Sequence, residues 1–414
     1  MIDIKLVREN PEVVKESLKK RNSKINLDNL IKLDEKWRKL KYQEDSIRKS
    51  RNSVSKKINK LKKAGKSAAK EIKIAKDIPK KLEKIEIQRK KLGDKIKTIL
   101  LTIPNFLDKE VPQGKDESQN KELKKWGKIP KISNPKSHEE LLKDLLDMKR
   151  AVNVSGAGFY FFKGELAQLQ RALINFMLDF HNTKGRTEIV SPLLAKPEAA
   201  EGTAHLPKFD KDMYKTREGL YLIPTAEMTL TNMHREEVLK RLPKRYYGYT
   251  PCFRTEAGQH GSGTPGIFRV HQFDKVEMVT ICNPKDSDKE FKSMIDDAEE
   301  ILRKLEIPYR ILILCSGDIG FKESMTYDIE TWSPYMKKYM ETSSISKCRD
   351  FQARRMNTKY QSKEGLKFVY TLNGSGLALP RLIIALVENN QNKDGSINIP
   401  KVLQPYMNGK KKIC

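Results

Sequence analysis

The chain has 414 residues, 38% of them hydrophobic, and a formal net charge of +28. This length predicts two or three domains with a sizeable core. It has no run of about 18 apolar residues, so no membrane span is expected. The first residues lack the features of a signal or transit peptide, which favours a cytoplasmic location. The five cysteines are dispersed without metal-ligand spacing, which predicts free thiols and no zinc site: Cys252, Cys282, Cys315, Cys348 and Cys414.

The positive charge is concentrated at one end of the chain. Residues 1–100 hold 32 Lys and Arg against 14 Asp and Glu, and the stretch 46–70 has ten basic residues and no acidic one. A basic, elongated segment favours a polyanionic partner. A solvated helix face in a lysine-rich protein fits the charge equally well.

The first hundred residues contain two heptad seams, from Leu33 to Leu61 and from Glu71 to Ile99, with steps of four and three throughout. Such spacing is typical of coiled-coil packing. We therefore predict an antiparallel two-helix hairpin about 45 Å long, turning near residues 63–67. Pro79 lies inside the second seam, so the helix is expected to kink there or to begin near Asp77.

In an antiparallel hairpin, the residue numbers of two facing positions add up to a nearly constant sum, and this sum sets the register. Leu40 opposite Leu92 gives 132, and on that register Glu44 faces Arg89, so two polar seam residues neutralise each other. Arg51 has no seam partner and is expected to extend outward to solvent.

The pattern changes after the hairpin. We expect an N-terminal domain over 1–105 with its arm at about 29–100, a turn-rich linker over 106–136, and a second domain over 137–414. In the last of these, helices alternate with short strands and hairpin-like links, which indicates an α+β fold with a mainly antiparallel sheet. Strands are predicted at 187–190, 220–223, 246–249, 267–270, 275–282, 310–314 and 368–372, and helices at 166–180 and 377–389.

A candidate nucleotide site lies in the middle of the second domain. Phe253-Arg254-Thr255-Glu256 is followed by the glycine-rich segment 258–266 and then by Arg269-Val-His-Gln-Phe273. Arginines clamp phosphate oxygens, and an aromatic ring can stack on a base. The two common glycine-rich nucleotide loops are absent from the sequence. Taken alone, Arg254 and Glu256 favour a structural ion pair, and Phe273 favours plain core packing.

Two further motifs flank this site. Leu372-Asn-Gly-Ser-Gly376 runs into a helix that carries Arg381, where small residues allow close approach of a ligand and the helix start adds partial positive charge. Gly185-Arg-Thr-Glu-Ile-Val-Ser-Pro192 reads as a strand end. By themselves these fit an ordinary turn before a helix and an ordinary strand.

With the opening residues 1–11, the basic hairpin and the three motifs in this order, the chain resembles the seryl-tRNA synthetase family of class II aminoacyl-tRNA synthetases. The resemblance implies the class II antiparallel sheet with flanking helices, a homodimer built on 185–192, and ligation of L-serine to serine tRNA through a seryl-adenylate. It implies ATP and Mg²⁺ as cofactors, contacts of the arm and the catalytic domain with the long variable arm and the acceptor end of the tRNA, and serylation of selenocysteine tRNA where that is present.

The same resemblance implies the site residues. Catalysis is expected from Arg254, Glu256 and Arg381. ATP is expected to bind Arg254, Thr255, Glu256, Arg269, Val270, Phe273, Glu341, Thr342, Ser343, Ser344 and Arg381, with Mg²⁺ on Glu341 and Ser344. Serine is expected to bind Thr225, Ala226, Glu227, Arg254, Glu277, Asn373 and Ser375, with the carboxylates for the amine and for the hydroxyl not assigned. Contacts of the arm with tRNA are expected from Arg48, Lys49, Arg51, Lys56, Lys57, Lys60 and Lys63.

Three other readings stay open at this level. A class II relative could load a carrier protein, but such relatives tend to lack a long arm. A paralogue that only binds RNA should have lost motif arginines, which are present here. A coiled-coil scaffold would leave the motifs unexplained.

Overall fold

The computed structural model describes residues 1–256 and 266–413, so Cys414 and the predicted glycine-rich loop, apart from Gly266, lie outside the described residues. The chain divides into two compact units, one from Ile2 to Ile103 and one that begins at Pro104. Each is described by itself. Within the described part of the chain, no helix combines the length and apolar character needed to cross a bilayer.

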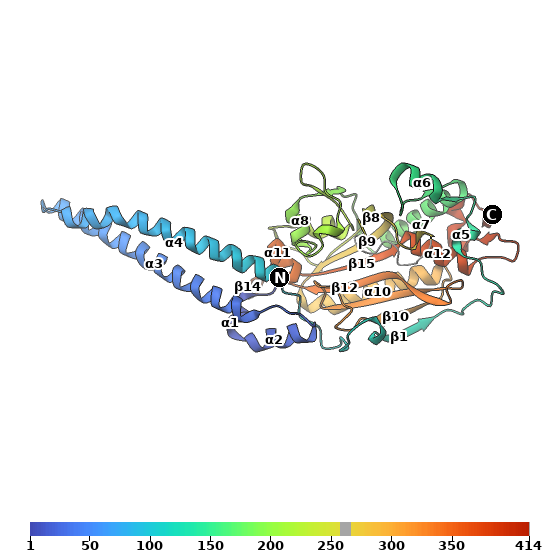
Figure 1. Ribbon diagram of the computed structural model, residues 1–414, viewed down its shortest axis with the longest axis horizontal. Coiled ribbons are helices and arrows are strands. Elements are labelled where there is room, and N and C mark those ends of the chain that lie inside the picture. Colours follow the sequence, from blue (N-terminus) through green and yellow to red (C-terminus); the bar gives the residue numbers. More distant parts are fainter. Residues whose placement is uncertain (257–265, 414) are drawn as a thin grey trace. The chain divides into compact units, whose positions relative to one another are not determined.

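The first unit consists of α1 (Ile4–Glu9), α2 (Pro11–Lys20), α3 (Leu27–Lys63) and α4 (Ala69–Thr102). Helix α3 starts where the Asn26 side chain accepts a hydrogen bond from the Asn29 N–H. Helices α3 and α4 run antiparallel, joined by a short turn in which Gly65 has a φ of +66° (Figure 1). The predicted two-helix hairpin is confirmed, with both helices longer than their seams.

The predicted pairing inside the hairpin is also confirmed. Glu44 is 1% exposed and accepts a hydrogen bond from Arg89 Nε at 2.5 Å, while Arg51 is exposed. Helix α4 is continuous through Pro79, so the predicted start near Asp77 is wrong. Proline removes one helix hydrogen bond, but Ile78 and Leu82 on either side of it are buried and hold the helix in place.

The second unit is built on an eight-stranded sheet of order β1-β10-β11-β12-β15-β9-β8-β4, antiparallel except for the parallel pair β4–β8 (Figure 1). The α+β prediction is confirmed. Its strands are β1 (Lys121–Trp126), β4 (Thr187–Glu188), β8 (Lys244–Phe253), β9 (Gln272–Cys282), β10 (Tyr309–Ile313), β11 (Met325–Ser333), β12 (Lys338–Arg349) and β15 (Tyr370–Ala378). Strand β1 lies within the predicted linker, so that segment contributes an edge of the sheet.

Short strands form four smaller sheets. They are β2 (Leu146–Asp147) with β3 (Phe161–Phe162), β5 (Leu194–Ala195) with β6 (Tyr221–Leu222), β7 (Val238–Leu239) with β13 (Lys359–Ser362) and β14 (Gly365–Phe368), and β16 (Ile397–Asn398) with β17 (Lys412–Ile413). The remaining helices are α5 (His138–Leu141), α6 (Met148–Ser155), α7 (Gly164–Thr183), α8 (Pro197–Gly202), α9 (Glu227–Asn232), α10 (Ser287–Lys304), α11 (Phe351–Met356) and α12 (Leu379–Asn389).

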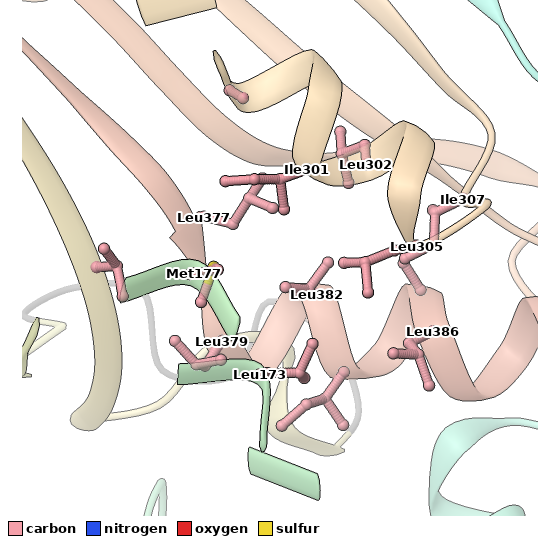
Figure 2. Close-up of a cluster of buried hydrophobic side chains, with 14 of the residues drawn as sticks. Leu173, Met177, Ile301, Leu302, Leu305, Ile307, Leu377, Leu379, Leu382 and Leu386 are labelled. Carbon is pink, nitrogen blue, oxygen red and sulfur yellow. The ribbon is translucent and has the colours of Figure 1, made fainter. Parts of the chain in front are cut away.

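Helices α7, α10 and α12 share the main hydrophobic core with the sheet. Leu379, Leu382 and Leu386 repeat at helical spacing on α12 and pack among Leu173 and Met177 of α7 and apolar residues of α10 (Figure 2). This packing fixes the first turn of α12, where Arg381 stands off the apolar stripe.

Strand β9 separates this core from the candidate site. Val276 and Met278 belong to the core, whereas the alternating residues Lys275 and Glu277 line a cavity on the other face. The strand predicted at 267–270 is wrong, because Gly266–Phe268 forms a 3₁₀ turn. There the buried Ile267 N–H donates to His138 instead of to a neighbouring strand.

Candidate active site

Three arginines from distant parts of the sequence line one cavity of about 160 Å³. Arg254 follows β8, Arg269 follows the 3₁₀ turn, and Arg381 lies in the first turn of α12. The rings of Phe268 and Phe273 form part of the same wall. The cavity therefore joins positive charge with aromatic surface, as a nucleotide requires.

Each of these arginines has a partner that orients it. Arg269 donates to Glu256 at 2.7 Å, and Arg381 donates to the carbonyl and side chain of Glu341 at 2.9 and 3.0 Å. The guanidinium of Arg254 lies 5.0 Å from the centre of the Phe273 ring. The sequence also allowed a structural ion pair between Arg254 and Glu256. Glu256 is in an ion pair, but its partner is Arg269 rather than Arg254.

A second cavity of about 440 Å³ adjoins the first and shares Arg254, Glu256, Arg269 and Glu341 with it. It is lined by five of the residues predicted to bind serine besides Arg254: Thr225, Glu227, Glu277, Asn373 and Ser375. The structure therefore places a polar pocket directly beside the arginine-lined cavity.

The two carboxylates of this pocket that were predicted to bind serine are held differently. Glu277 is 1% exposed and interacts through both oxygens, with Lys275 at 2.7 Å and with Ser375 Oγ and Asn373 Nδ2 at 3.4 Å each. Lys275 also donates to Thr225 Oγ1 at 2.9 Å.

Glu227 is 3% exposed and uses only Oε1, which accepts from Gln352 Nε2 at 2.7 Å and faces Lys322 Nζ at 3.2 Å. Among the described residues, no hydrogen bond reaches its Oε2.

Three predicted site residues do not line either cavity. The Ala226 methyl packs in a small apolar cluster with Leu230 and Val279. Thr255 Oγ1 donates to the Lys211 carbonyl at 2.6 Å, and Ser343 Oγ donates to the Ser375 carbonyl at 2.5 Å. These side chains hold the backbone around the site.

The glycines of the segment 372–376 are closely packed. Gly374 and Gly376 are in the central strand β15, and a Cβ at Gly374 would lie 2.8 Å from the Ile345 side chain. A Cβ at Gly376 would lie 2.8 Å from Nε2 of the buried His181. Close contacts around the strand therefore favour glycine at both positions, and close approach of a ligand here stays a prediction.

The pair predicted to hold magnesium lies at the rim of the shared cavities. Glu341 and Ser344 are on β12, and Asp328 on β11 is opposite Ser344 in the register. Asp328 Oδ1 is buried without a hydrogen-bond partner among the described residues. Burial and the nearby Glu341 raise the pKa of Asp328 well above its ordinary value.

The seven predicted arm residues are all exposed on α3. Arg48 is paired with Glu44 and Glu86, and Lys57 with Glu71 at 2.9 Å. Lys56, Lys60 and Lys63 surround a shallow hollow at the end of the helix. The last group concentrates positive charge near the turn.

Sequence reasoning missed several residues of the pocket, notably Phe268, Lys275 and Lys322. One signal for Lys275 was present: it stands midway between Phe273 and Glu277, so the two-residue period of a strand puts all three on one face. Lys322 lies in a loop, where no period applies.

Residues 1–107 match the model of the seryl-tRNA synthetase N-terminal domain, and residues 208–390 match that of the tRNA synthetase class II core domain (G, H, P, S and T). A serine–tRNA ligase of Carboxydothermus hydrogenoformans is 46% identical over 98% of each chain. The chain belongs to the seryl-tRNA synthetase family.

Solved structures of the family agree over the full length. The seryl-tRNA synthetase of Pyrococcus horikoshii, complexed with ATP, has a TM-score of 0.93 and 38% identity, covering 100% of this chain and 99% of that one. The cytoplasmic serine–tRNA ligase of Naegleria fowleri, in complex with AMP, has a TM-score of 0.89 and 31% identity, covering 100% and 98%.

Proposed function

We propose that this protein ligates L-serine to serine tRNA at the expense of ATP, through a seryl-adenylate. The observation that carries this proposal is the joined pair of cavities, one lined by Arg254, Arg269 and Arg381 and the other by carboxylates and hydroxyls. Family membership supports it, because a nucleotide and a small polar amino acid must meet in such an enzyme.

In the first step, a serine carboxylate oxygen attacks the α-phosphorus of ATP. A new P–O bond forms, the bond to the β-phosphate oxygen breaks, and pyrophosphate leaves. Arg254 is proposed to hold the α-phosphate and Arg381 the γ-phosphate, with Arg269 and Glu256 completing the nucleotide pocket. Catalysis then comes from positioning and charge neutralisation, with no protein nucleophile.

In the second step, the 3′-hydroxyl of the terminal tRNA ribose attacks the seryl carbonyl, and AMP leaves. The arm is proposed to bind the long variable region of serine tRNA through the exposed basic residues of α3. Contacts of this kind give affinity through phosphates without reading bases. Selenocysteine tRNA, where present, would be bound by the same surface.

The pocket geometry now suggests which carboxylate meets which part of serine. We assign the ammonium group to Glu227, because its Oε2 accepts no hydrogen bond from the described residues. We assign the hydroxyl to Glu277 and Ser375, since Lys275 already neutralises that carboxylate. A pocket that pairs a hydroxyl rejects alanine by leaving buried polar groups unpaired.

The residues at the rim fit a magnesium ion bound with ATP. Glu341 and Ser344 supply the hard oxygen atoms that Mg²⁺ prefers. The unpartnered Asp328 Oδ1 and the mutual repulsion of Asp328 and Glu341 indicate a place where a cation is favourable. When bound, the ion would neutralise phosphate charge.

Homodimerisation through the segment 185–192 is also proposed. Strand β4 forms one end of the sheet, and the chain beyond it exposes apolar side chains: Val190 is 94% exposed and Leu194 46%. Such a surface beside a sheet edge fits an interface between two copies.

Amino-acid-dependent exchange of pyrophosphate into ATP tests the proposed function. Serine should support exchange, with threonine, alanine and glycine far weaker, and the protein should then charge serine tRNA within a total tRNA pool. Equal exchange with alanine, or none with serine, would refute the proposal.

A further inference from the structure

We infer that Lys322 and Glu323 are specificity-determining positioning residues that, with Glu227, form a buried charge set matched to one substrate ammonium group. This inference rests on the proposed function, since it concerns how the amino-acid pocket binds serine.

The three side chains form a chain of contacts along the wall of the polar cavity. Lys322 Nζ lies 2.6 Å from Glu323 Oε1 and 3.2 Å from Glu227 Oε1. The Lys322 backbone N–H also donates to Glu323 Oε2 at 3.0 Å. The side chains of Lys322 and Glu323 are only 14% and 12% exposed, so these charges interact with little screening by water.

The contact with Lys322 fixes the orientation of the Glu227 carboxylate. Burial lowers the pKa of Lys322, but the charges of Glu227 and Glu323 outweigh it, and the pKa lies well above its ordinary value. Lys322 is therefore an ammonium ion that faces the Glu227 carboxylate. Because Lys322 and Gln352 both approach Oε1, the carboxylate is held with Oε2 left for the substrate.

The net charge differs between the side of the pocket that carries Glu227 and the side that carries Glu277. Two carboxylates and one lysine give Glu227, Lys322 and Glu323 a net charge of −1, which one ammonium group neutralises. The pair Lys275 and Glu277 on the other side has no net charge, which suits a neutral hydroxyl.

Two further titratable groups near Lys322, His205 and Cys348, carry no charge at neutral pH. Burial, together with the charges of Lys322 and Arg254, lowers the pKa of His205 to about 3. Burial raises the pKa of the Cys348 thiol above its ordinary value. Both groups are therefore neutral beside the charge set.

The loop that carries Lys322 is tied to a fixed part of the same unit. Asn105, 3% exposed, donates through Nδ2 to the carbonyls of Lys322 and Cys348 at 2.9 and 2.8 Å. Its N–H donates to the Phe321 carbonyl at 3.0 Å, and the Asp108 N–H donates to the Ser324 carbonyl at 2.9 Å. These hydrogen bonds hold the backbone around Lys322 in place, as a residue that lines a binding pocket requires.

The test changes the net charge in both directions and then restores it. Glu323→Gln leaves a net charge of zero and should raise the KM for serine about tenfold in pyrophosphate exchange, with the KM for ATP unchanged. Lys322→Met leaves two facing carboxylates with a net charge of −2, which one ammonium group does not neutralise, and should also raise the serine KM about tenfold. Lys322→Met combined with Glu323→Gln restores −1 and should return the serine KM to within about threefold of the wild-type value.

If Lys322 has only a structural role, the opposite result is expected. The double variant would then have a serine KM at least as high as that of the worse single variant. That result, or an unchanged serine KM in Glu323→Gln, would overturn the inference. Circular dichroism and thermal unfolding show which variants fold, and Lys363→Met, in an exposed turn, is the matched control. Serine-dependent exchange by the wild-type protein decides the proposed function separately.

Discussion

The arm and the sheet domain both depend on charged residues, but they hold them in opposite ways. On α3 most basic side chains are exposed, and Lys57 stays 66% exposed although it is paired with the largely buried Glu71. In the sheet domain the charges of Glu227, Glu277 and Lys275 are buried, and each has a fixed partner.

The difference in burial determines whether one charged residue can replace another. An exposed cation acts through a field that salt screens, so one lysine can stand in for another. A buried charge acts at one position and cannot be moved without leaving its partner unpaired. Substitutions should therefore have graded effects in the arm and abrupt effects in the site.

The largest expected effect is that of Arg254→Ala. Loss of the guanidinium that is proposed to hold the α-phosphate should lower serine-dependent pyrophosphate exchange by about 10³-fold or more while the fold is kept. Arg254→Lys should not restore the rate, because lysine lacks the planar fork of donors. Arg171→Ala, on the exposed side of α7, is the matched control. Exchange at the wild-type rate in Arg254→Ala would exclude the assigned role.

A smaller effect should follow from neutralising the arm. Each change of Lys49, Lys56, Lys60 or Lys63 to Gln should raise the KM for tRNA modestly, and the four together should raise it by about tenfold or more at physiological salt. The dependence of log K on log salt should flatten by up to about 1 per phosphate contact removed. Exchange should not change.

The matched control for these arm variants is Lys289→Gln with Lys292→Gln on α10, which removes exposed charge from the other unit. One arm lysine accounting for the whole loss would contradict the interchangeable behaviour of this surface.

The smallest effect concerns the ion pair between Glu44 and Arg89, which the heptad seams predicted. Glu44→Ala removes the partner of Arg89 and should destabilise the arm by about 1–3 kcal/mol. Glu44→Leu combined with Arg89→Leu should cost less than the single change, because leucines suit seam positions. Hydrogen exchange of the α3 amides measures this locally. Slower exchange in Glu44→Ala than in the wild type would be the contrary outcome.

Much of this architecture could be predicted from the sequence. The heptad seams carry the register of the hairpin in the residue numbers themselves, which is how Glu44 and Arg89 could be paired. The arginines of the nucleotide cavity could be found because each stands within a distinctive motif.

The parts that could not be predicted have physical reasons. Strands β11 and β12 were not predicted. In β11 the alternation of apolar Met325, Tyr327 and Ile329 with polar residues was present and was overlooked, whereas in β12 the polar run 341–344 interrupts the alternation that marks a strand. The close packing of Ile345 against Gly374 could not be predicted, because it joins two strands that are far apart in the sequence. Lys322 depends on a loop held by Asn105, which no local pattern reveals.

The division of labour between the two units is tested most directly on a single shortened protein. Residues 41–91 are replaced by a short flexible linker that joins Leu40 to Leu92, neighbours in the predicted register. The buried Leu30 and the Arg8–Asp34 ion pair (2.7 Å) at the base of the arm are kept. Serine-dependent pyrophosphate exchange should stay within about twofold of the wild type, and charging of serine tRNA should fall by about a hundredfold or more. Full charging by the shortened protein, or loss of exchange together with charging, would contradict the account.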